Sequence, residues 1–467
     1  MNRHDTDPQR PVIHFAPERG WMNDPNGLIH INGEYHMFYQ YNPCGAVGPA
    51  QARISWGHAR SRDLVRWEHL PPALAPGATY DNSGVWSGCT VPDDAGVPNI
   101  FYTGVGRPPL LAQTQCRATS RDMIHWRRTR PNPVIKMPPA GVSRWLFRDP
   151  YVWRHSPGQW LMAVGASLWG RGAVLLYESQ NLHDWKYLHP LHMADNALTH
   201  GWMWECPVVV RFGDRWLIVV SVVGGRAVWF TGGLSDKLRF EQERSGVLDP
   251  GNCFFAPQMF VDETGRCILF AWLRENRRRA ARHGWQGCMS LPRIITLDAQ
   301  GWPQYAPAPE LETLRREHTH YENIEIDPAA PHALPHAHGD CLEIHALMRP
   351  GAAARCGLHV RSAPDRSEQT SIYYDTAKQQ LIVDRARSSR APHAQRAPQS
   401  APLALSPGEP LDLRVFLDRS ALEIFANARA CLTTRIYPAS PDSRHTALFA
   451  AGGPANALSF DAWRLAI

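Results

Sequence analysis

The chain has no apolar run that could cross a bilayer, for which about 20 consecutive apolar residues are needed. Its first 15 residues, MNRHDTDPQRPVIHF, also lack the apolar segment of a secretory signal peptide. We therefore expect a cytoplasmic protein with no membrane partner.

Cysteine pairs of the CxxC type are absent as well. The ten cysteines are scattered between Cys44 and Cys431. Because common zinc-binding and redox motifs need closely spaced pairs, we expect reduced thiols, no metal and no cofactor.

Dense charge of one sign is rare. The net charge of +6 comes from basic residues that are mostly spread along the sequence of 467 residues, so a nucleic-acid partner is not expected. Only the segment Arg274 to His283 is densely basic. We interpret it as a solvated loop, with an arginine cluster that recognises phosphate as the alternative.

Long helical periodicity is also missing, and short β-branched runs between glycines and prolines indicate an all-β fold. A repeat supports this: SRDLVRW begins at Ser61, SRDMIHW at Ser120 and SQNLHDW at Ser179, a spacing of 59 residues twice over. Each copy follows a strand-like run and supplies a turn whose tryptophan can pack under the next strand. About five such periods fit between His14 and Tyr305, which predicts a five-bladed β-propeller.

The C-terminal part of the sequence predicts a different arrangement of strands. The segment Pro309 to Glu317 predicts a short linking helix, and the runs after it alternate like the strands of a β-sandwich. The predicted domains are therefore a catalytic propeller over 1–305, a linker over 306–319 and a sandwich over 320–467. Within the sandwich, Arg387 to Pro410 predicts a long loop.

Three carboxylates stand in unusual surroundings. Asp24 lies in WMNDPNG, Asp149 in FRDPY and Glu205 in WMWECP. Pro25 and Gly27 predict a rigid turn around Asp24. One acid in an aromatic setting is often a satisfied structural group, but three of them, in a chain with 18 tryptophans, indicate a sugar-cleaving site.

These segments closely resemble the signatures of glycoside hydrolase family 32, which includes invertases, β-fructofuranosidases and sucrose-6-phosphate hydrolases. Further matching segments, in the family's order, are YHMFYQYNP from Tyr35, WGHARSRDLVRW from Trp56, GVWSG from Gly84, FAPQ from Phe255, MSLPR from Met289 and DRSALEIF from Asp418. The family's architecture, a propeller followed by a sandwich, agrees with the independent interpretation above.

The resemblance implies a retaining hydrolase that cleaves terminal β-D-fructofuranosyl bonds, with Asp24 as nucleophile, Glu205 as acid/base and Asp149 as transition-state stabiliser. Arg148 would help to keep Asp149 ionised. The other residues expected to line the fructose pocket are Asn23, Gln40, Trp56, Trp86, Ser87 and Trp272. Each of these tryptophans could equally belong to the propeller core.

The chain departs from the family in two places. No tryptophan follows YNP in Cys44 to Arg53, which predicts a smaller or more polar wall towards the leaving group. The family's Asp-Phe-Tyr-Ala is replaced by Cys253-Phe254-Phe255-Ala256, near the expected acid/base.

Several functions remain open at this point. The leading hypothesis is release of fructose from sucrose or short fructo-oligosaccharides. Fructosyl transfer and sucrose-6-phosphate hydrolysis are the alternatives, and a non-catalytic fructan-binding protein is disfavoured because all three acids are present. The sequence does not distinguish sucrose from inulin or levan, exo from endo action, or one oligomeric state from another.

Overall fold

The computed structural model describes residues 7–46, 53–106, 113–196, 200–275, 283–392 and 394–467. Contacts divide the chain into two compact units. The propeller unit contains Ala16–Leu248 and Phe255–Trp302, and the sandwich unit contains Met1–Phe15, Asp249–Phe254 and Pro303–Ile467. The two short segments assigned to the sandwich unit were not part of the predicted division. The domain boundaries at 305 and 319 stay predictions.

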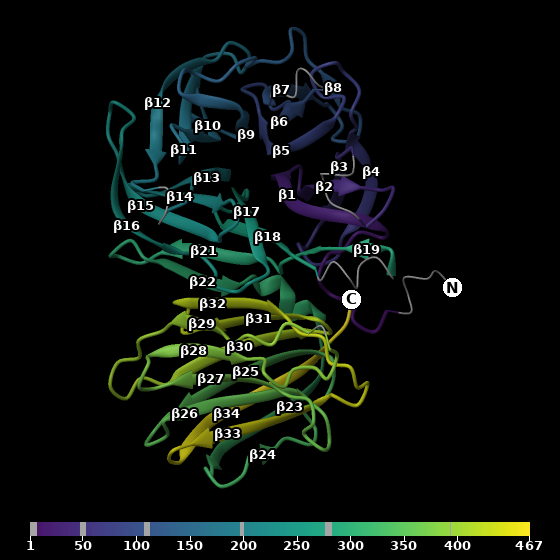
Figure 1. Ribbon diagram of the computed structural model, residues 1–467, viewed down its shortest axis with the longest axis vertical. Coiled ribbons are helices and arrows are strands. Elements are labelled where there is room, and N and C mark those ends of the chain that lie inside the picture. Colours follow the sequence, from purple (N-terminus) through teal and green to yellow (C-terminus); the bar gives the residue numbers. More distant parts are fainter. Residues whose placement is uncertain (1–6, 47–52, 107–112, 197–199, 276–282, 393) are drawn as a thin grey trace. The chain divides into compact units, whose positions relative to one another are not determined.

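The described part of the propeller unit contains five sheets, as the repeat predicts. In each sheet the first strand in sequence lies innermost, and Figure 1 shows β1, β5, β9, β13 and β17 grouped around the centre of this unit. The segment β19 pairs in parallel with β1, so a segment that lies in sequence between the strands of the last sheet joins the first sheet. We refer to the sheets as blades 1 to 5 in chain order.

The strands of blades 1 to 3 are β1 (Gly20–Ile31), β2 (Glu34–Asn42), β3 (Ser55–Ser61), β4 (Glu68–Leu74), β5 (Gly84–Pro92), β6 (Pro98–Val105), β7 (Gln113–Thr119), β8 (Arg127–Arg128), β9 (Val142–Ser156), β10 (Gln159–Leu168), β11 (Arg171–Ser179) and β12 (Lys186–Met193). Those of blades 4 and 5, with β19, are β13 (Trp204–Phe212), β14 (Arg215–Val222), β15 (Ala227–Leu234), β16 (Phe240–Val247), β17 (Phe254–Val261), β18 (Cys267–Leu273), β19 (Trp285–Gln286), β20 (Cys288–Met289), β21 (Arg293–Leu297) and β22 (Pro303–Pro307).

The repeated heptapeptides form the turns between the third and fourth strands of blades 1 to 3. In the first copy, the Asp63 carboxylate accepts hydrogen bonds from the Val65 and Arg66 backbone N–H groups, at 3.2 and 2.8 Å. Asp122 and Asn181 do the same in the second and third copies. A carboxylate or amide at this position therefore stabilises the turn by an Asx-type bond.

The packing of the repeat tryptophans under the next strand stays a prediction, but the structure shows contacts that it did not include. These tryptophans contact the second strand of the preceding blade: Trp67 lies edge-on to Phe270, Trp126 to Phe38 and Trp185 to Phe101, with ring centroids 5.6–5.8 Å apart. One large aromatic side chain per turn thus buries apolar surface between neighbouring blades, which explains why the residue recurs with the blade period.

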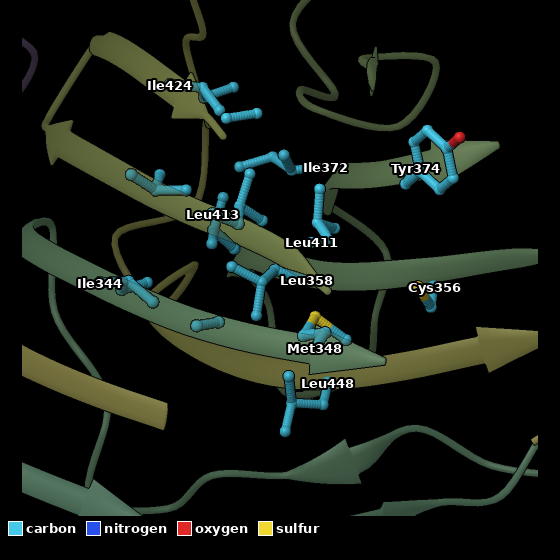
Figure 2. Packing of buried hydrophobic residues seen from close by; sticks show 14 of the residues in the cluster. Ile344, Met348, Cys356, Leu358, Ile372, Tyr374, Leu411, Leu413, Ile424 and Leu448 are labelled. Atoms are coloured by element: carbon cyan, nitrogen blue, oxygen red, sulfur yellow. The ribbon is translucent and has the colours of Figure 1, made fainter. Parts of the chain in front are cut away.

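The sandwich unit contains two six-stranded sheets. The first has the order β23-β34-β25-β30-β31-β32 and the second β24-β33-β26-β27-β28-β29. The strands are β23 (Arg315–Ile326), β24 (His332–Ala333), β25 (Cys341–Arg349), β26 (Arg355–Ser362), β27 (Thr370–Asp375), β28 (Gln380–Asp384), β29 (Gln399–Pro402), β30 (Leu411–Asp418), β31 (Ala421–Ala426), β32 (Ala430–Arg435), β33 (His445–Ala451) and β34 (Ala455–Leu465). Figure 2 shows Ile344 and Leu413 of the first sheet in one apolar cluster with Leu358 and Leu448 of the second.

Two sequence predictions can be compared directly with this unit. The linking helix is present as a 3-10 helix over Pro309–Leu314. The predicted loop from Arg387 to Pro410 is wrong in part, because Gln399–Pro402 forms β29 and pairs with β28. Ser400 and Pro402 are exposed while Ala401 is buried, so a short edge strand with polar and proline residues looked like a loop in the sequence. Within the described residues, no helix is long and apolar enough to cross a membrane.

Candidate active site

Asp24 lies within a strand and not on a turn, which corrects the prediction from Pro25 and Gly27. Met22 pairs with Tyr41 and Pro25 pairs with Tyr39, so two residues of β1 face one residue of β2. This irregularity is a β-bulge. Proline is tolerated there because the interrupted ladder needs no N–H donor at that point.

The same feature recurs in other inner strands. In β9 the register shifts between Arg148 and Tyr151, and in β13 it shifts between Glu205 and Val208. Asp149 and Cys206 occupy these bulges with positive φ angles of 65° and 48°, a conformation that is uncommon for residues other than glycine. Both residues precede a proline.

Side chains of the preceding blade hold these bulges. The backbone N–H of Asp149 donates to Thr103 Oγ1 at 2.8 Å, and that of Cys206 donates to Asp149 Oδ2 at 3.0 Å. In blade 5, the N–H of Ala256, with φ 48°, donates to Ser221 Oγ at 3.1 Å. The bulges release these backbone N–H groups from the hydrogen bonds of the sheet. The released groups bond side chains of the preceding blade and so fix each of these inner strands to it.

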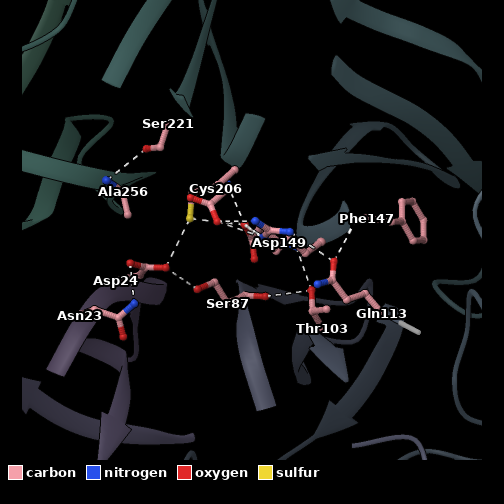
Figure 3. Close-up of polar contacts among 12 residues, drawn as sticks. Asn23, Asp24, Ser87, Thr103, Gln113, Phe147, Asp149, Cys206, Ser221 and Ala256 are labelled. Carbon is pink, nitrogen blue, oxygen red and sulfur yellow. Dashed lines mark hydrogen bonds and ion pairs between the residues drawn. The ribbon is translucent and has the colours of Figure 1, made fainter. Parts of the chain in front are cut away.

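The three predicted catalytic acids are brought together from three blades. Ser87 Oγ donates to Asp24 Oδ2 at 2.7 Å, and Asn23 Nδ2 donates to Asp24 Oδ1 at 2.8 Å. The Cys206 thiol lies 3.6 Å from both Asp24 Oδ2 and Asp149 Oδ2. Figure 3 shows this thiol between the two aspartates.

Arg148 joins the third acid to the cluster. Its Nε and Nη2 atoms donate to Glu205 Oε1 at 3.0 and 2.5 Å, whereas its nearest approach to Asp149 Oδ2 is 3.9 Å. The hydrogen-bond partner of Arg148 is therefore Glu205, while its positive charge still lowers the pKa of Asp149, as expected. The guanidinium group also lies 5.9 Å from the centre of the Trp86 ring.

The electrostatics of the cluster favour retention of a proton. Burial, followed by the charge of Glu205, raises the pKa of Asp24 to about 6, although hydrogen bonds from Ser87 and Cys206 oppose the shift. Burial also raises the pKa of Asp149 despite the nearby positive charge of Arg148. Like charges in a desolvated site disfavour full ionisation.

Cys206 acts here as a hydrogen-bond donor. Burial and the adjacent carboxylates raise its pKa well above the ordinary value, so the sulfur remains a thiol. Its sulfur lies 3.6 Å from one carboxylate oxygen of each aspartate, so the single S–H proton can be donated to either one, which partly offsets their mutual repulsion.

The predicted pocket residues divide into two groups, those that hold a neighbouring strand in place and those that lie beside the acids. Trp56 is fully buried, packs against Phe38 and donates from Nε1 to the Trp86 carbonyl oxygen at 2.9 Å. Gln40 is also buried and donates to the Val85 carbonyl oxygen at 3.2 Å. Both residues therefore hold the strand that carries Ser87, and the environment of Trp56 favours the core alternative.

Trp272 lies beside the site. It packs against a small buried cluster of Cys206, Phe255 and Ala256. The Trp272 Nε1 and the Asn23 Oδ1 are both buried without a hydrogen-bond partner among the described residues. Buried polar atoms in native proteins are normally paired, so these two atoms are suited to bind polar groups of a ligand.

Sequence reasoning missed the residues that support the acids. Cys206 and Thr103 are examples, together with Gln113, whose Oε1 accepts a hydrogen bond from the Phe147 N–H at 2.9 Å. One signal was available: the dipeptides Asp24-Pro25, Asp149-Pro150, Cys206-Pro207 and Ala256-Pro257 recur in the inner strands. They mark the bulges before any contact is known.

The structure describes one of the two departures from the family pattern fully and the other only in part. Residues 47–52 of the segment from Cys44 to Arg53 lie outside the described residues. Phe255 packs beside Cys206, and Cys206 directly follows Glu205 in the sequence. Cys253 belongs to the sandwich unit, where its thiol donates to the Thr433 carbonyl oxygen at 3.5 Å.

Comparison with known proteins agrees with this architecture and site. Residues 14–305 match the glycosyl hydrolases family 32 N-terminal domain, and residues 310–464 match the family 32 C-terminal domain. The chain therefore belongs to glycoside hydrolase family 32 and is a glycoside hydrolase, as its motifs predict.

Individual relatives cover nearly the whole chain. A sucrose-6-phosphate hydrolase of Zymomonas mobilis is 36% identical over 97% of this chain and 92% of its own length. A raffinose invertase of Escherichia coli is 34% identical over 97% and 95%. The crystal structure of fructan 1-exohydrolase IIa from Cichorium intybus superposes with a TM-score of 0.91 at 27% identity, over 98% of each chain.

Proposed function

We propose that this protein hydrolyses terminal β-D-fructofuranosyl bonds in sucrose or short fructo-oligosaccharides, with retention of configuration. The observation that carries the proposal is the cluster of Asp24, Asp149 and Glu205, which three inner strands bring together around one thiol and one guanidinium group. Retaining glycosidases need a carboxylate nucleophile and a second carboxyl group that donates and then accepts a proton.

Asp24 is the proposed nucleophile. Ser87 and Asn23 each bond one of its carboxylate oxygens, which fixes its orientation. Attack on the anomeric carbon gives a covalent fructosyl-enzyme, and esterification removes the negative charge of Asp24. Water then releases fructose with the original configuration.

Glu205 is the proposed acid/base. It protonates the departing oxygen in the first step and takes a proton from water in the second, which requires carboxyl groups about 5–5.5 Å apart. Arg148 holds the Glu205 side chain through two hydrogen bonds. These two hydrogen bonds fix the position of the Glu205 carboxyl group.

Asp149 is the proposed stabiliser of the transition state. One of its oxygens accepts the Cys206 N–H, and its negative charge suits the positive character that develops on the fructosyl ring. We infer that the unpaired Trp272 Nε1 and Asn23 Oδ1 bind fructose hydroxyl groups, since a sugar supplies both donors and acceptors.

The first test replaces the nucleophile. Asp24→Asn changes the volume of the side chain little but removes its nucleophilic charge, so we expect turnover to be lost while sucrose binding remains measurable by calorimetry. Asp236→Asn, at an exposed turn of blade 4, is the matched control and should keep the wild-type rate. Near wild-type turnover in Asp24→Asn would remove Asp24 from the mechanism.

The second test separates the two steps of Glu205. With sucrose, Glu205→Ala should reduce kcat by about 10²–10⁴-fold, because departure of the glucose oxygen needs a proton. An activated aryl fructoside leaves without this help, so we expect a burst of aryl alcohol followed by slow hydrolysis that azide accelerates. Equal losses on both substrates without an azide effect would assign Glu205 to binding or folding.

A second candidate substrate is sucrose 6-phosphate, as the name of the Zymomonas mobilis relative suggests. The Arg274 guanidinium carbon lies 4.0 Å from the centre of the Phe255 ring and 5.7 Å from that of Trp272. The basic segment therefore begins beside residues that pack against Cys206. The rest of the predicted cluster, over 276–282, lies outside the described residues.

Two measurements distinguish the alternatives. Arg274→Gln should reduce turnover of sucrose 6-phosphate at least tenfold more than turnover of sucrose if the arginine recognises phosphate. Equal effects would assign Arg274 to the packing of Phe255. Products formed from concentrated sucrose separate hydrolysis, which gives equal glucose and fructose, from fructosyl transfer, which gives glucose in excess of fructose.

A further inference from the structure

A cluster of metal-ligating side chains lies on the sandwich unit and is not used by the proposed reaction. His318 and His320 are separated by one residue on β23, and Asp461 pairs with His320 from the adjacent strand β34. The three potential ligand atoms lie within 4.8 Å of one another. Among the described residues, no other group of three His, Cys, Asp or Glu side chains meets this condition.

We propose that His318, His320 and Asp461 bind a divalent transition-metal cation, with zinc as the best match to two imidazoles and one carboxylate. Alternation along a strand places residues two apart on the same face, so both imidazoles can reach one ion. Water completes the coordination of an exposed three-ligand site. This proposal departs from the expectation of no metal, which rested on the absence of CxxC pairs and therefore bears only on cysteine-based sites.

The distances suit zinc with small adjustments. Asp461 Oδ1 is 2.8 Å from His318 Nε2 and 2.7 Å from His320 Nδ1. Bonds of about 2.0–2.2 Å in a tetrahedral site separate neighbouring ligand atoms by about 3.4 Å. The carboxylate must therefore move away by several tenths of an ångström, and the two imidazole nitrogens, which lie within 4.8 Å of each other, must be separated by about 3.4 Å. Exposed side chains can make both adjustments by small rotations.

The surroundings orient both imidazoles. His320 Nε2 lies 3.1 Å from Glu322 Oε1. A proton donated from Nε2 to this carboxylate leaves the Nδ1 lone pair for a metal, the arrangement that recurs around zinc-bound histidines. His318 is stacked on Trp463, with ring centroids 4.8 Å apart and planes inclined by 5°.

The local charge also favours a dication. Two carboxylates, Asp461 and Glu322, accompany two imidazoles that are neutral when they bind a metal. Arg315 also contacts the Trp463 ring, at 4.0 Å, but both its Nε and Nη2 atoms are paired with the carboxylate of Glu343. Glu343 is therefore the main partner of this charge, although Arg315 also interacts electrostatically with Asp461.

A bound metal would join two particular strands. β23 is the edge strand that follows the linking helix, and β34 is the last strand of the chain. An ion that binds only the folded sheet shifts the equilibrium towards it. The expected consequence is resistance of this edge to local opening.

The test uses the full chain without an affinity tag, first stripped with a chelator and then titrated with zinc chloride in a calorimeter. We expect one zinc ion per chain, and we expect His320→Ala and Asp461→Asn each to weaken that binding at least tenfold. His125→Ala is the control, because His125 is exposed and also bonds an aspartate, Asp122, but lies in the propeller unit. Its zinc binding should equal that of the wild type.

A second readout does not depend on affinity alone. Cobalt in place of zinc should give visible absorption bands of a low-coordinate site, absent in Asp461→Asn. Zinc at 100 times its Kd should raise the Tm of the wild type by several degrees and that of His320→Ala by much less. No zinc binding by the wild type, or the same binding in His320→Ala and Asp461→Asn, would overturn the proposal.

Discussion

At the scale of single residues, the ionisation of Asp24 should set the acid limit of activity. A nucleophile must be ionised, and its surroundings raise the pKa of Asp24 to about 6. We therefore expect kcat/KM to fall as the pH decreases through about 6. If the nucleophile had an ordinary carboxyl pKa, the enzyme would keep its activity to a pH about two units lower.

Ser87 offers a way to move that limit. Its hydroxyl bonds the ionised form of Asp24, so Ser87→Ala should raise the pKa of Asp24 further. Hydrogen bonds to charged groups contribute about 1.5–3 kcal/mol, so the acid limb of kcat/KM should move up by about 1–2 pH units. Ser156→Ala, at the end of β9, is the control and should leave the limb in place. An unchanged acid limb in Ser87→Ala would show that another group determines it.

At the scale of elements, the bulges explain why ordinary strands can present catalytic acids. A regular strand would alternate its side chains between the two faces of its blade. The bulges at Asp24, Asp149 and Cys206 interrupt this alternation next to the centre of the unit. The hydrogen bonds between blades then hold the resulting conformations.

A substitution at Thr103 tests whether the hydrogen bonds between blades hold the bulges. Thr103→Val keeps the shape but removes the acceptor of the Asp149 N–H, and an unsatisfied buried donor costs about 1–3 kcal/mol. We expect a lower Tm together with a fall in kcat, because Asp149 loses its fixed position. Thr114→Val is the control: the Thr114 hydroxyl donates to the Gly104 carbonyl oxygen and receives no backbone N–H bond in the bulges. A loss of stability without any fall in kcat would limit Thr103 to folding.

Elements also show what the sequence could and could not predict. The three acids were identifiable because Asp and Glu among tryptophans and prolines are rare in strands, and the blades because Ser61, Ser120 and Ser179 begin equal repeats. Thr103 and Ser221 gave no signal, since threonine and serine are common in strands and their roles arise only when two blades meet. The positive φ angles of Leu64, Met123 and Leu182 in the repeat turns, 61–63°, also had no marker, because leucine and methionine do not favour them.

At the scale of the whole molecule, three separate stretches of chain build the sandwich unit. The segment before the propeller unit is held by Asp418, whose carboxylate accepts hydrogen bonds from the N–H groups of Val12, Ile13 and His14 at 2.7–3.0 Å. The segment Asp249–Phe254 is held by Asp249, which accepts bonds from the Thr433 N–H and hydroxyl at 3.0 and 2.6 Å. The chain therefore contributes to this unit before, within and after the propeller sequence.

A buried charged triad completes the first of these connections. The His14 ring lies between Asp418 Oδ2 at 2.8 Å and Glu423 Oε1 at 3.0 Å, and the three side chains are inaccessible to solvent. Burial alone would lower the pKa of His14, but hydrogen bonds to the two carboxylates outweigh it and raise the pKa. Although burial opposes ionisation of Asp418, the bonds from His14 and the backbone lower its pKa.

These shifts predict how stability depends on pH. Because the pKa of His14 is raised in the folded state, its stabilising effect is complete below about pH 6.5 and is lost as the pH rises through the folded value. Because the pKa of Asp418 is lowered, its effect is present above about pH 3.8 and is lost on acidification. The triad should therefore stabilise the sandwich unit most strongly between these limits.

Replacing the histidine should reveal this contribution. His14→Phe leaves two buried carboxylates without their cation, which should cost about 3–5 kcal/mol of unfolding free energy at pH 6. The loss should become smaller towards alkaline pH, where the wild-type histidine also loses its charge. Urea unfolding at pH 6 and pH 9 measures both effects, with His332→Phe on the exposed strand β24 as the control. Equal midpoints for His14→Phe and the wild type at pH 6, or a difference that does not change with pH, would contradict a charged His14 in the folded protein.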